Sequence, residues 1–202
     1  MQTLHGNGSN SKKSSHRLAG ISSMVGTTIE WYDFFIYGAA AALIFNKLFF
    51  PNLDPLTGAL AAFGTYAVGF IGRPLGGLVF GHFGDKIGRK SMLLLTLMLM
   101  GIPTVLIGLL PTYESIGYWA AICLVILRFI QGMAMGGEWG GAVLMAVEHA
   151  PEGKKGFWGS LPQASTGGGL MLASIALGLV SLLPEQALFS WGWRIPFLAS
   201  IV

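Results

Sequence analysis

Charged residues are scarce in this chain. Only 10% of its 202 residues are charged and 53% are hydrophobic, whereas about a quarter of the residues of a soluble domain are charged. A water-soluble protein of this composition would have too little polar surface to cover itself, so lipid is the expected solvent. The 30 glycines agree with this interpretation, because glycine is more frequent in membrane helices than in soluble ones.

Cysteine is almost absent as well. Cys123 is the only one, and it lies within an apolar run, which excludes disulfides and cysteine-based metal sites. The N-terminal residues are polar and lack the hydrophobic core of a signal peptide, so we interpret residues 1–19 as a disordered cytoplasmic tail. The net charge of +3 comes without a clustered basic face, and no nucleic-acid partner is expected.

Long apolar runs make up the rest of the chain. A membrane helix needs roughly 20 apolar residues to cross about 30 Å of hydrocarbon. Residues 20–202 are therefore predicted to form an all-α, polytopic membrane helix bundle. Five full spans and the start of a sixth are expected at residues 20–48, 58–80, 91–110, 118–146, 157–183 and 195–202. Because the sixth run stops early, we expect the chain to be truncated.

Lysine and arginine are distributed unevenly among the breaks between these runs. Most of them precede the first span, separate the second from the third, or follow the fourth, whereas Lys47 and Arg194 fall on the opposite side. Basic residues accumulate in cytoplasmic loops. We therefore expect a multi-pass protein of the cytoplasmic membrane with its N-terminus in the cytoplasm.

Several charged side chains nevertheless lie inside the predicted spans. Each costs about 2.5–3.5 kcal/mol at the membrane centre on insertion scales, and such residues usually line a pathway. Static ion pairing between helices is the alternative explanation. The residues concerned are Glu30, Asp33, Arg73, Arg128 and Glu138.

Two of these acids share one helix face with a tyrosine. Glu30 and Asp33 are three residues apart, and Tyr37 follows four residues later, a spacing that aligns side chains on a helix. A carboxylate there suits proton carriage, because a neighbouring arginine favours its ionised form while removal from water favours the neutral one. Asp33 is the expected carrier, with Glu30 as the alternative, and Arg128 is expected to contact an anionic group of the substrate.

Glycines recur at intervals of four residues in the second and fourth predicted spans. Helices in lipid pack closely where small residues face each other, so these pairs predict tight packing, with helix sliding as a second interpretation. The pairs are Gly72 and Gly76, Gly77 and Gly81, Gly132 and Gly136, and Gly137 and Gly141.

The segment GHFGDKIGRK, between the second and third spans, is the most specific motif in the chain. Its glycines permit a tight turn, and its aspartate can accept hydrogen bonds near a helix N-terminus. Its basic residues would anchor the segment at the cytoplasmic face. The residues concerned are Gly81, Gly84, Asp85, Lys86, Gly88, Arg89 and Lys90.

This segment resembles the signature between helices two and three of the major facilitator superfamily. The surrounding sequences resemble its metabolite:proton symporter branch, the carriers of proline/betaine, shikimate, citrate and 2-oxoglutarate. The matching sequences are EWYDF (30–34), RPLGGLVFGHFGDKIGRK (73–90), RFIQGMAMGGEWGGA (128–142) and WGWRIPF (191–197). Lys86 stands where the pattern usually has arginine.

The resemblance implies roles for individual residues. Asp85 and Arg89 would belong to a cytoplasmic latch, and Arg128 and Gln131 would match a helix-four motif linked to proton coupling. The chain would be the N-terminal six-helix half of a two-half carrier of the bacterial inner membrane. The C-terminal half would be missing, and Glu30, Asp33 and Arg73 would face the central cavity.

We therefore expect a secondary active transporter that couples protons to a small organic acid or zwitterionic metabolite by alternating access. Its partners would be that substrate, protons, the lipid bilayer and the missing half. A membrane enzyme is disfavoured because no nucleophile–base pair or histidine cluster converges in a span, and no cofactor or metal is expected. The remaining alternative is a non-transporting scaffold or sensor built on the same fold.

Overall fold

The computed structural model describes residues 7–148, 153 and 155–201, and the regular elements in this part of the chain are all helical. The prediction of an all-α helix bundle is confirmed. The long helices are α1 (Asn7–Ala40), α3 (Pro55–Ile87), α4 (Arg89–Leu109), α6 (Tyr118–Glu148) and α7 (Lys155–Val180). The short ones are η1 (Ala41–Phe45), α2 (Asn46–Phe49), α5 (Tyr113–Ile116), α8 (Glu185–Ala187), η2 (Leu188–Gly192), α9 (Arg194–Leu198) and η3 (Ala199–Ile201).

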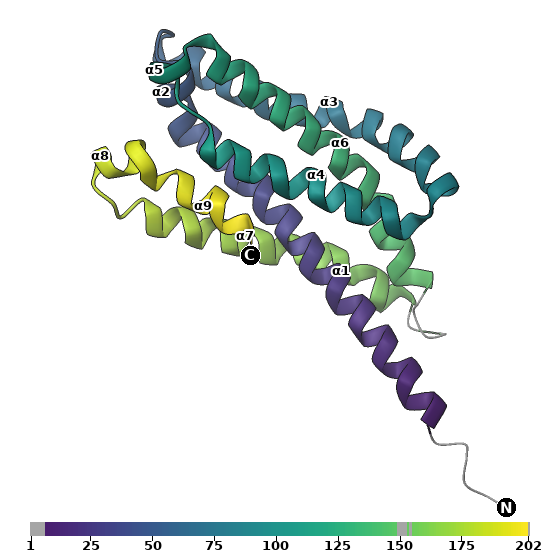
Figure 1. The fold of residues 1–202 in the computed structure, drawn as a ribbon. Helices are drawn as coiled ribbons and strands as arrows, with labels where there is room; N and C mark the ends of the chain where they lie inside the picture. The colour runs from purple at the N-terminus through teal and green to yellow at the C-terminus, as the bar shows by residue number, and fades with distance from the viewer. Residues whose placement is uncertain (1–6, 149–152, 154, 202) are drawn as a thin grey trace, which may run out of the picture.

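Figure 1 shows how the long helices are arranged. Helix α3 packs along α6, α1 packs along α7, and α4 contacts both α6 and α9. Three helices of the described part are long and apolar enough to cross a membrane, at Pro55–Gly84, Tyr118–Gly137 and Gln163–Val180, and Leu94–Leu109 is a shorter apolar helix. The N-terminal part of α1 extends beyond the other helices (Figure 1).

Two helix boundaries differ from the sequence-based expectation. Helix α1 begins at Asn7, so residues 7–19 are helical rather than disordered, because extending an existing helix adds a hydrogen bond for each residue. Residues 1–6 lie outside the described residues. The sixth helical segment begins at Glu185, ten residues before the predicted start, because helical hydrogen bonding continues through η2 into α9.

The segment at 81–90 is also more regular than a loop. Helix α3 continues to Ile87 and α4 begins at Arg89, so the reversal of the chain falls on Gly88 alone. Gly88 has a φ of 106°, which only glycine adopts readily. Gly81 and Gly84 therefore lie in the last turns of α3. Asp85 belongs to the last turn of α3 as well, and not to the start of α4 as expected.

The sixth helical segment is fastened to the bundle by polar and aromatic contacts. The Arg194 Nη1 donates to the carbonyl oxygens of Gly108 (2.8 Å) and Leu110 (2.9 Å), which satisfies the C-terminal carbonyls of α4. The Tyr32 hydroxyl of α1 donates to the Pro196 carbonyl at 2.7 Å. A buried aromatic cluster joins the same segments: Tyr37, Phe45, Phe49, Trp193 and Phe197.

Asp54 lies between α2 and α3 and caps the start of α3. Its Oδ1 accepts a hydrogen bond from the Thr57 backbone N–H at 3.2 Å, and Pro55 occupies the first helical position. Both are typical helix-start signals. The hydrogen bonds from Thr57 hold the pKa of Asp54 below its usual value.

Helices α3 and α6 are in backbone contact through glycines. A Cβ on Gly132 would overlap the Gly69 carbonyl, and a Cβ on Gly136 would overlap the Arg73 carbonyl. On the facing helix, Gly76 lies equally close to the backbone of Met133. The predicted close packing is confirmed for these glycines.

The other predicted glycine pairs behave differently. Gly77 has ordinary contact distances, and nothing lies within 4 Å of a Cβ on Gly81. Gly137 packs against Phe80, and the side-chain environment of Gly141 is outside the described residues. Spacing alone therefore does not identify which glycines face a neighbouring helix.

We expect Gly132→Ala to lower the free energy of unfolding by about 1–3 kcal/mol, because the added methyl group must displace the Gly69 carbonyl. Gly101→Ala is the matched control in α4, where a Cβ meets nothing within 4 Å and alanine favours the helix by up to about 1 kcal/mol. Thermal unfolding of the detergent-solubilised protein, followed by tryptophan fluorescence, measures both. Equal unfolding temperatures for the two variants would contradict the packing assignment.

Candidate functional site

Buried polar side chains form a continuous hydrogen-bonded chain across the bundle. The Arg128 Nη1 of α6 donates to the Gln131 Oε1 at 3.1 Å, and the Gln131 Nε2 donates to the Thr104 Oγ1 at 2.7 Å. The Thr104 hydroxyl of α4 is 2.8 Å from the Asp33 Oδ2 of α1, and Ser200 donates to the Asp33 Oδ1 at 2.6 Å. The chain therefore joins α1, α4, α6 and the sixth helical segment.

The carboxyl group of Asp33 is removed from solvent, since only 1% of the residue is exposed. Hydroxyl donors on both oxygens replace the water that it loses, as a buried charge requires. The described ion pairs include no direct contact between Asp33 and Arg128. Gln131 and Thr104 lie between the two side chains, so Arg128 acts on the Asp33 carboxylate from a distance and not by direct contact.

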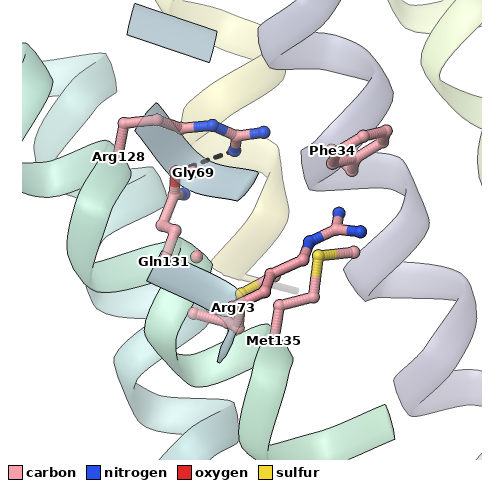
Figure 2. A pocket seen from close by; sticks show the side chains of 8 residues that line it. Phe34, Gly69, Arg73, Arg128, Gln131 and Met135 are labelled. Carbon is pink, nitrogen blue, oxygen red and sulfur yellow. Dashed lines mark hydrogen bonds between the residues drawn. The ribbon is translucent and has the colours of Figure 1, made fainter. Parts of the chain in front are cut away.

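The two intramembrane arginines lie against aromatic rings. The Arg128 Cζ is 4.3 Å from the Tyr37 ring centroid, 4.9 Å from that of Tyr66 and 5.4 Å from that of Phe34. The Arg73 Cζ is 4.5 Å from the Phe70 ring centroid and 5.0 Å from that of Phe34. Ring faces stabilise guanidinium groups in place of water. Figure 2 shows both guanidinium ends directed toward Phe34.

A small hollow lies beside the arginines; it contains about 220 Å³ of empty space when the open solvent at its mouth is counted, and enclosed room for about one water molecule. Helices α1, α3, α4 and α6 all contribute to its wall. A Cβ on Gly69 would lie 2.9 Å from the Arg128 Nε, so glycine at this position leaves room for the guanidinium. The lining residues are Phe34, Gly69, Arg73, Met100, Arg128, Gln131, Gly132 and Met135.

The Arg128 Nε is buried and has no hydrogen-bond partner in the described part of the chain. An unpartnered donor on a buried cation is costly, and its side chain lines the cavity. A carboxylate that entered the cavity would find hydrogen-bond donors on two guanidinium groups. The arrangement therefore suits a small anionic ligand.

The remaining predicted site residues differ in where they lie: some are buried near the arginines, one is exposed, and others lie outside the described residues. Glu30 is buried and interacts electrostatically with Arg73. The Tyr37 hydroxyl is 2.7 Å from the Thr65 Oγ1, so this ring meets α3 as well as Arg128. Lys86 is exposed at the end of α3. The side chains of Asp85, Arg89, Lys90 and Glu138 lie outside the described residues, so their predicted roles stay predictions.

Thr104, Ser200 and Phe34 are site residues that the sequence analysis missed. A hydroxyl in an apolar helix is inconspicuous, because it can bond to its own backbone, as Thr104 does to the Met100 carbonyl at 2.9 Å. Phe34 belongs to a segment rich in aromatic residues, and nothing in its spacing separates it from Phe35. Only the position of Phe34 immediately after Asp33 pointed to this region.

Apolar helices around a buried polar network and a cavity define an integral membrane helix bundle with a polar site at the depth of its spans. More specifically, the chain belongs to the sugar (and other) transporter family, whose model matches residues 19–202. The fold is that of the major facilitator superfamily. A solved proton:xylose symporter, XylE from Escherichia coli, superimposes with a TM-score of 0.77 at 18% identity, over 94% of this chain and 43% of that one.

Curated relatives are bacterial transport proteins. The chain is 55% identical to the shikimate transporter of Escherichia coli over 92% of its own length, and 48% identical to the inner membrane metabolite transport protein YhjE of the same organism over 90%. It is 42% identical to the Escherichia coli proline/betaine transporter over 92%. The matches cover 43%, 42% and 37% of those proteins, so this chain spans about two fifths of their length.

We expect Gln131→Leu to lower the free energy of unfolding by about 1–3 kcal/mol, because it leaves Arg128 and Thr104 with buried, unsatisfied groups. Gln163→Leu is the control, since Gln163 is exposed on α7. Thermal unfolding in detergent compares the two variants. A Gln131→Leu protein as stable as the control would show that the hydrogen-bonded chain contributes nothing to the fold.

Proposed function

We propose that this chain is the N-terminal half of a proton-coupled symporter that moves a small organic anion across the bacterial inner membrane. The observation that carries the proposal is the chain from Arg128 through Gln131 and Thr104 to Asp33. It connects a buried carboxyl group, which can take up a proton, to a cation beside a cavity. Transport requires the second half, and the partners are the solute, protons, lipid and that half.

The charges around the cavity favour an organic acid over a solute without negative charge. Arg73 and Arg128 both line the cavity, and the unpartnered Nε of Arg128 offers a donor to a carboxylate. Phe34 presents a ring that can pack against the rest of the solute. Among the relatives, the carrier with the higher identity is named for an acid and the one with the lower identity for zwitterions. A zwitterionic metabolite is the second candidate, with Glu30 or Asp33 meeting its cationic group.

The topology proposed with this function places the N-terminus in the cytoplasm. The six spans would be α1 with η1 and α2, then α3, α4, α6, α7, and the segment from α8 onward. The connection at Gly88 would then face the cytoplasm, where Asp85, Lys86 and Arg89 would act as the latch between the two halves. The uneven distribution of lysine and arginine supports this orientation.

We expect Asp33→Asn to abolish uphill uptake while the protein stays folded, because asparagine keeps two polar atoms for Thr104 and Ser200 but takes up no proton. The measurement is uptake of a panel of carboxylates and betaines into proteoliposomes that contain the complete carrier, with and without an imposed pH gradient. Thermal unfolding checks the fold. Uphill accumulation by the variant at the wild-type level would remove Asp33 as the proton carrier.

We expect Arg128→Lys to reduce uptake at least tenfold. A lysine keeps the charge but cannot bond to Gln131, stack on Tyr37 and present a second nitrogen to the solute at the same time. The same uptake assay measures the effect, and Lys47→Arg on the exposed surface is the control for a conservative cation exchange. Normal transport by Arg128→Lys would leave Arg128 as a positive charge without a geometric role.

A non-transporting scaffold or sensor is the competing function. It predicts that the complete protein binds a solute, or none, but never accumulates it. Dissipation of the pH gradient by a protonophore separates the two functions, because a symporter loses its uphill uptake and a scaffold has none to lose.

A further inference from the structure

We propose that the Thr104 hydroxyl reverses its hydrogen bond with Asp33, which lets Asp33 take up and release a proton inside the helix bundle. The inference rests on the proposed function, in which Asp33 carries the proton. Thr104 is a positioning residue on α4, since it acts through Asp33 and not on the solute. Three hydrogen bonds meet at its Oγ1 atom, with Asp33, Met100 and Gln131.

One hydroxyl proton serves two acceptors in this position. The Thr104 Oγ1 is 2.8 Å from the Asp33 Oδ2 and 2.9 Å from the Met100 carbonyl oxygen, and both are within donating distance. A hydroxyl donates one hydrogen bond at a time but accepts two. The Gln131 Nε2, at 2.7 Å, occupies one of the accepting positions. The other accepting position is available for a donor that arrives on Asp33.

The hydrogen bond between Thr104 and Asp33 then has opposite directions in the two charge states of Asp33. When Asp33 is ionised, Thr104 donates to its Oδ2, Ser200 donates to its Oδ1, and Gln131 donates to Thr104. When a proton binds the Oδ2, the new carboxyl O–H donates to the Thr104 Oγ1. The threonine hydroxyl turns and donates to the Met100 carbonyl. Each of these donors has an acceptor in either state.

This exchange matters because the carboxyl group of Asp33 and its partner Thr104 are buried. Asp33, Thr104 and Gln131 are 1%, 0% and 2% exposed, so solvent cannot replace a hydrogen bond that protonation breaks. An unsatisfied buried donor or acceptor costs about 1–3 kcal/mol. With threonine at position 104, neither the ionised nor the protonated form of Asp33 carries that cost. Nearby charges can therefore shift the equilibrium between the two forms.

The charges around Asp33 come from several helices. On α1 itself the titratable neighbours are Glu30, Tyr32 and Tyr37, and Arg128 acts from α6. Helix α3 contributes Arg73, which interacts with Glu30, whereas α7 has no charged residue after Lys155. Within the described residues, helix α4 and the sixth segment contact Asp33 through the hydroxyl groups of Thr104 and Ser200. An anion that binds Arg128 would therefore weaken the cation's hold on the ionised form of Asp33 and favour proton uptake.

The test is an infrared pH titration of the complete carrier in lipid. The C=O stretch of the protonated Asp33 carboxyl is assigned as the band that Asp33→Asn removes. We expect Thr104→Val to move the midpoint of this band upward by about one pH unit. A hydrogen bond to a charged acceptor is roughly twice as strong as a hydrogen bond between neutral groups, so loss of the hydroxyl destabilises the ionised state of Asp33 more than the protonated state. Thr104→Ser, which keeps the hydroxyl, is expected to keep the wild-type midpoint.

Thr27→Val in α1 is the matched control, since Thr27 is buried and its hydroxyl has no hydrogen-bond partner within the described residues. If Thr104→Val does not fold, Thr104→Ala takes its place. A midpoint that is unchanged or lower without the hydroxyl overturns the proposal, as does an equal upward shift in Thr27→Val. The titration does not depend on transport, so a carrier without proton-coupled uptake would overturn the proposed function while the midpoints still decide the role of Thr104.

Discussion

Backbone contact between α3 and α6 determines the geometry of the candidate site. A Cβ on Gly132 would overlap the Gly69 carbonyl and a Cβ on Gly76 would overlap the Met133 backbone, so neither helix has room for a side chain at these positions. Because the helices meet there, Arg73 of α3 and Arg128 of α6 both reach the ring of Phe34 on α1. Lipid gives no hydrophobic reason for helices to associate, so close packing of this kind must hold the two arginines in place.

Hydrogen bonding imposes the second constraint. Each polar group inside the bundle needs a partner, and the structure satisfies Asp33 with hydroxyls from α4 and the sixth helical segment. Arg128 is linked to the same group through Gln131. The site is thus shared by four helical segments, and a relative movement of any one of them changes the environment of the carboxyl group. The proposed proton-coupled transport by alternating access would depend on that property.

Some parts of the site could be predicted from local sequence. Glu30, Asp33 and Arg128 lie within apolar runs, and all three are buried, because a charge in such a run is stabilised only inside the bundle. The shared face of Glu30, Asp33 and Tyr37 also follows from helical spacing. Their partners could not be predicted, since Asp33 bonds to residues 71 and 167 positions away. The turn at 81–90 was too long in the prediction, because only the positive φ of Gly88 shows where α3 ends.

The amino-acid sequence alone predicted that this protein is a membrane helix bundle and that Glu30, Asp33 and Arg128 lie inside it, where all three are buried. Both follow from composition and from the 3.6-residue period, which are local properties. The three-dimensional structure was needed to show that Thr104 and Ser200 bind Asp33, that Gln131 lies between Asp33 and Arg128, and which glycines contact another helix. The physical reason is that hydroxyls and glycines are common in any membrane helix. Their significance depends on which atoms another helix places opposite them.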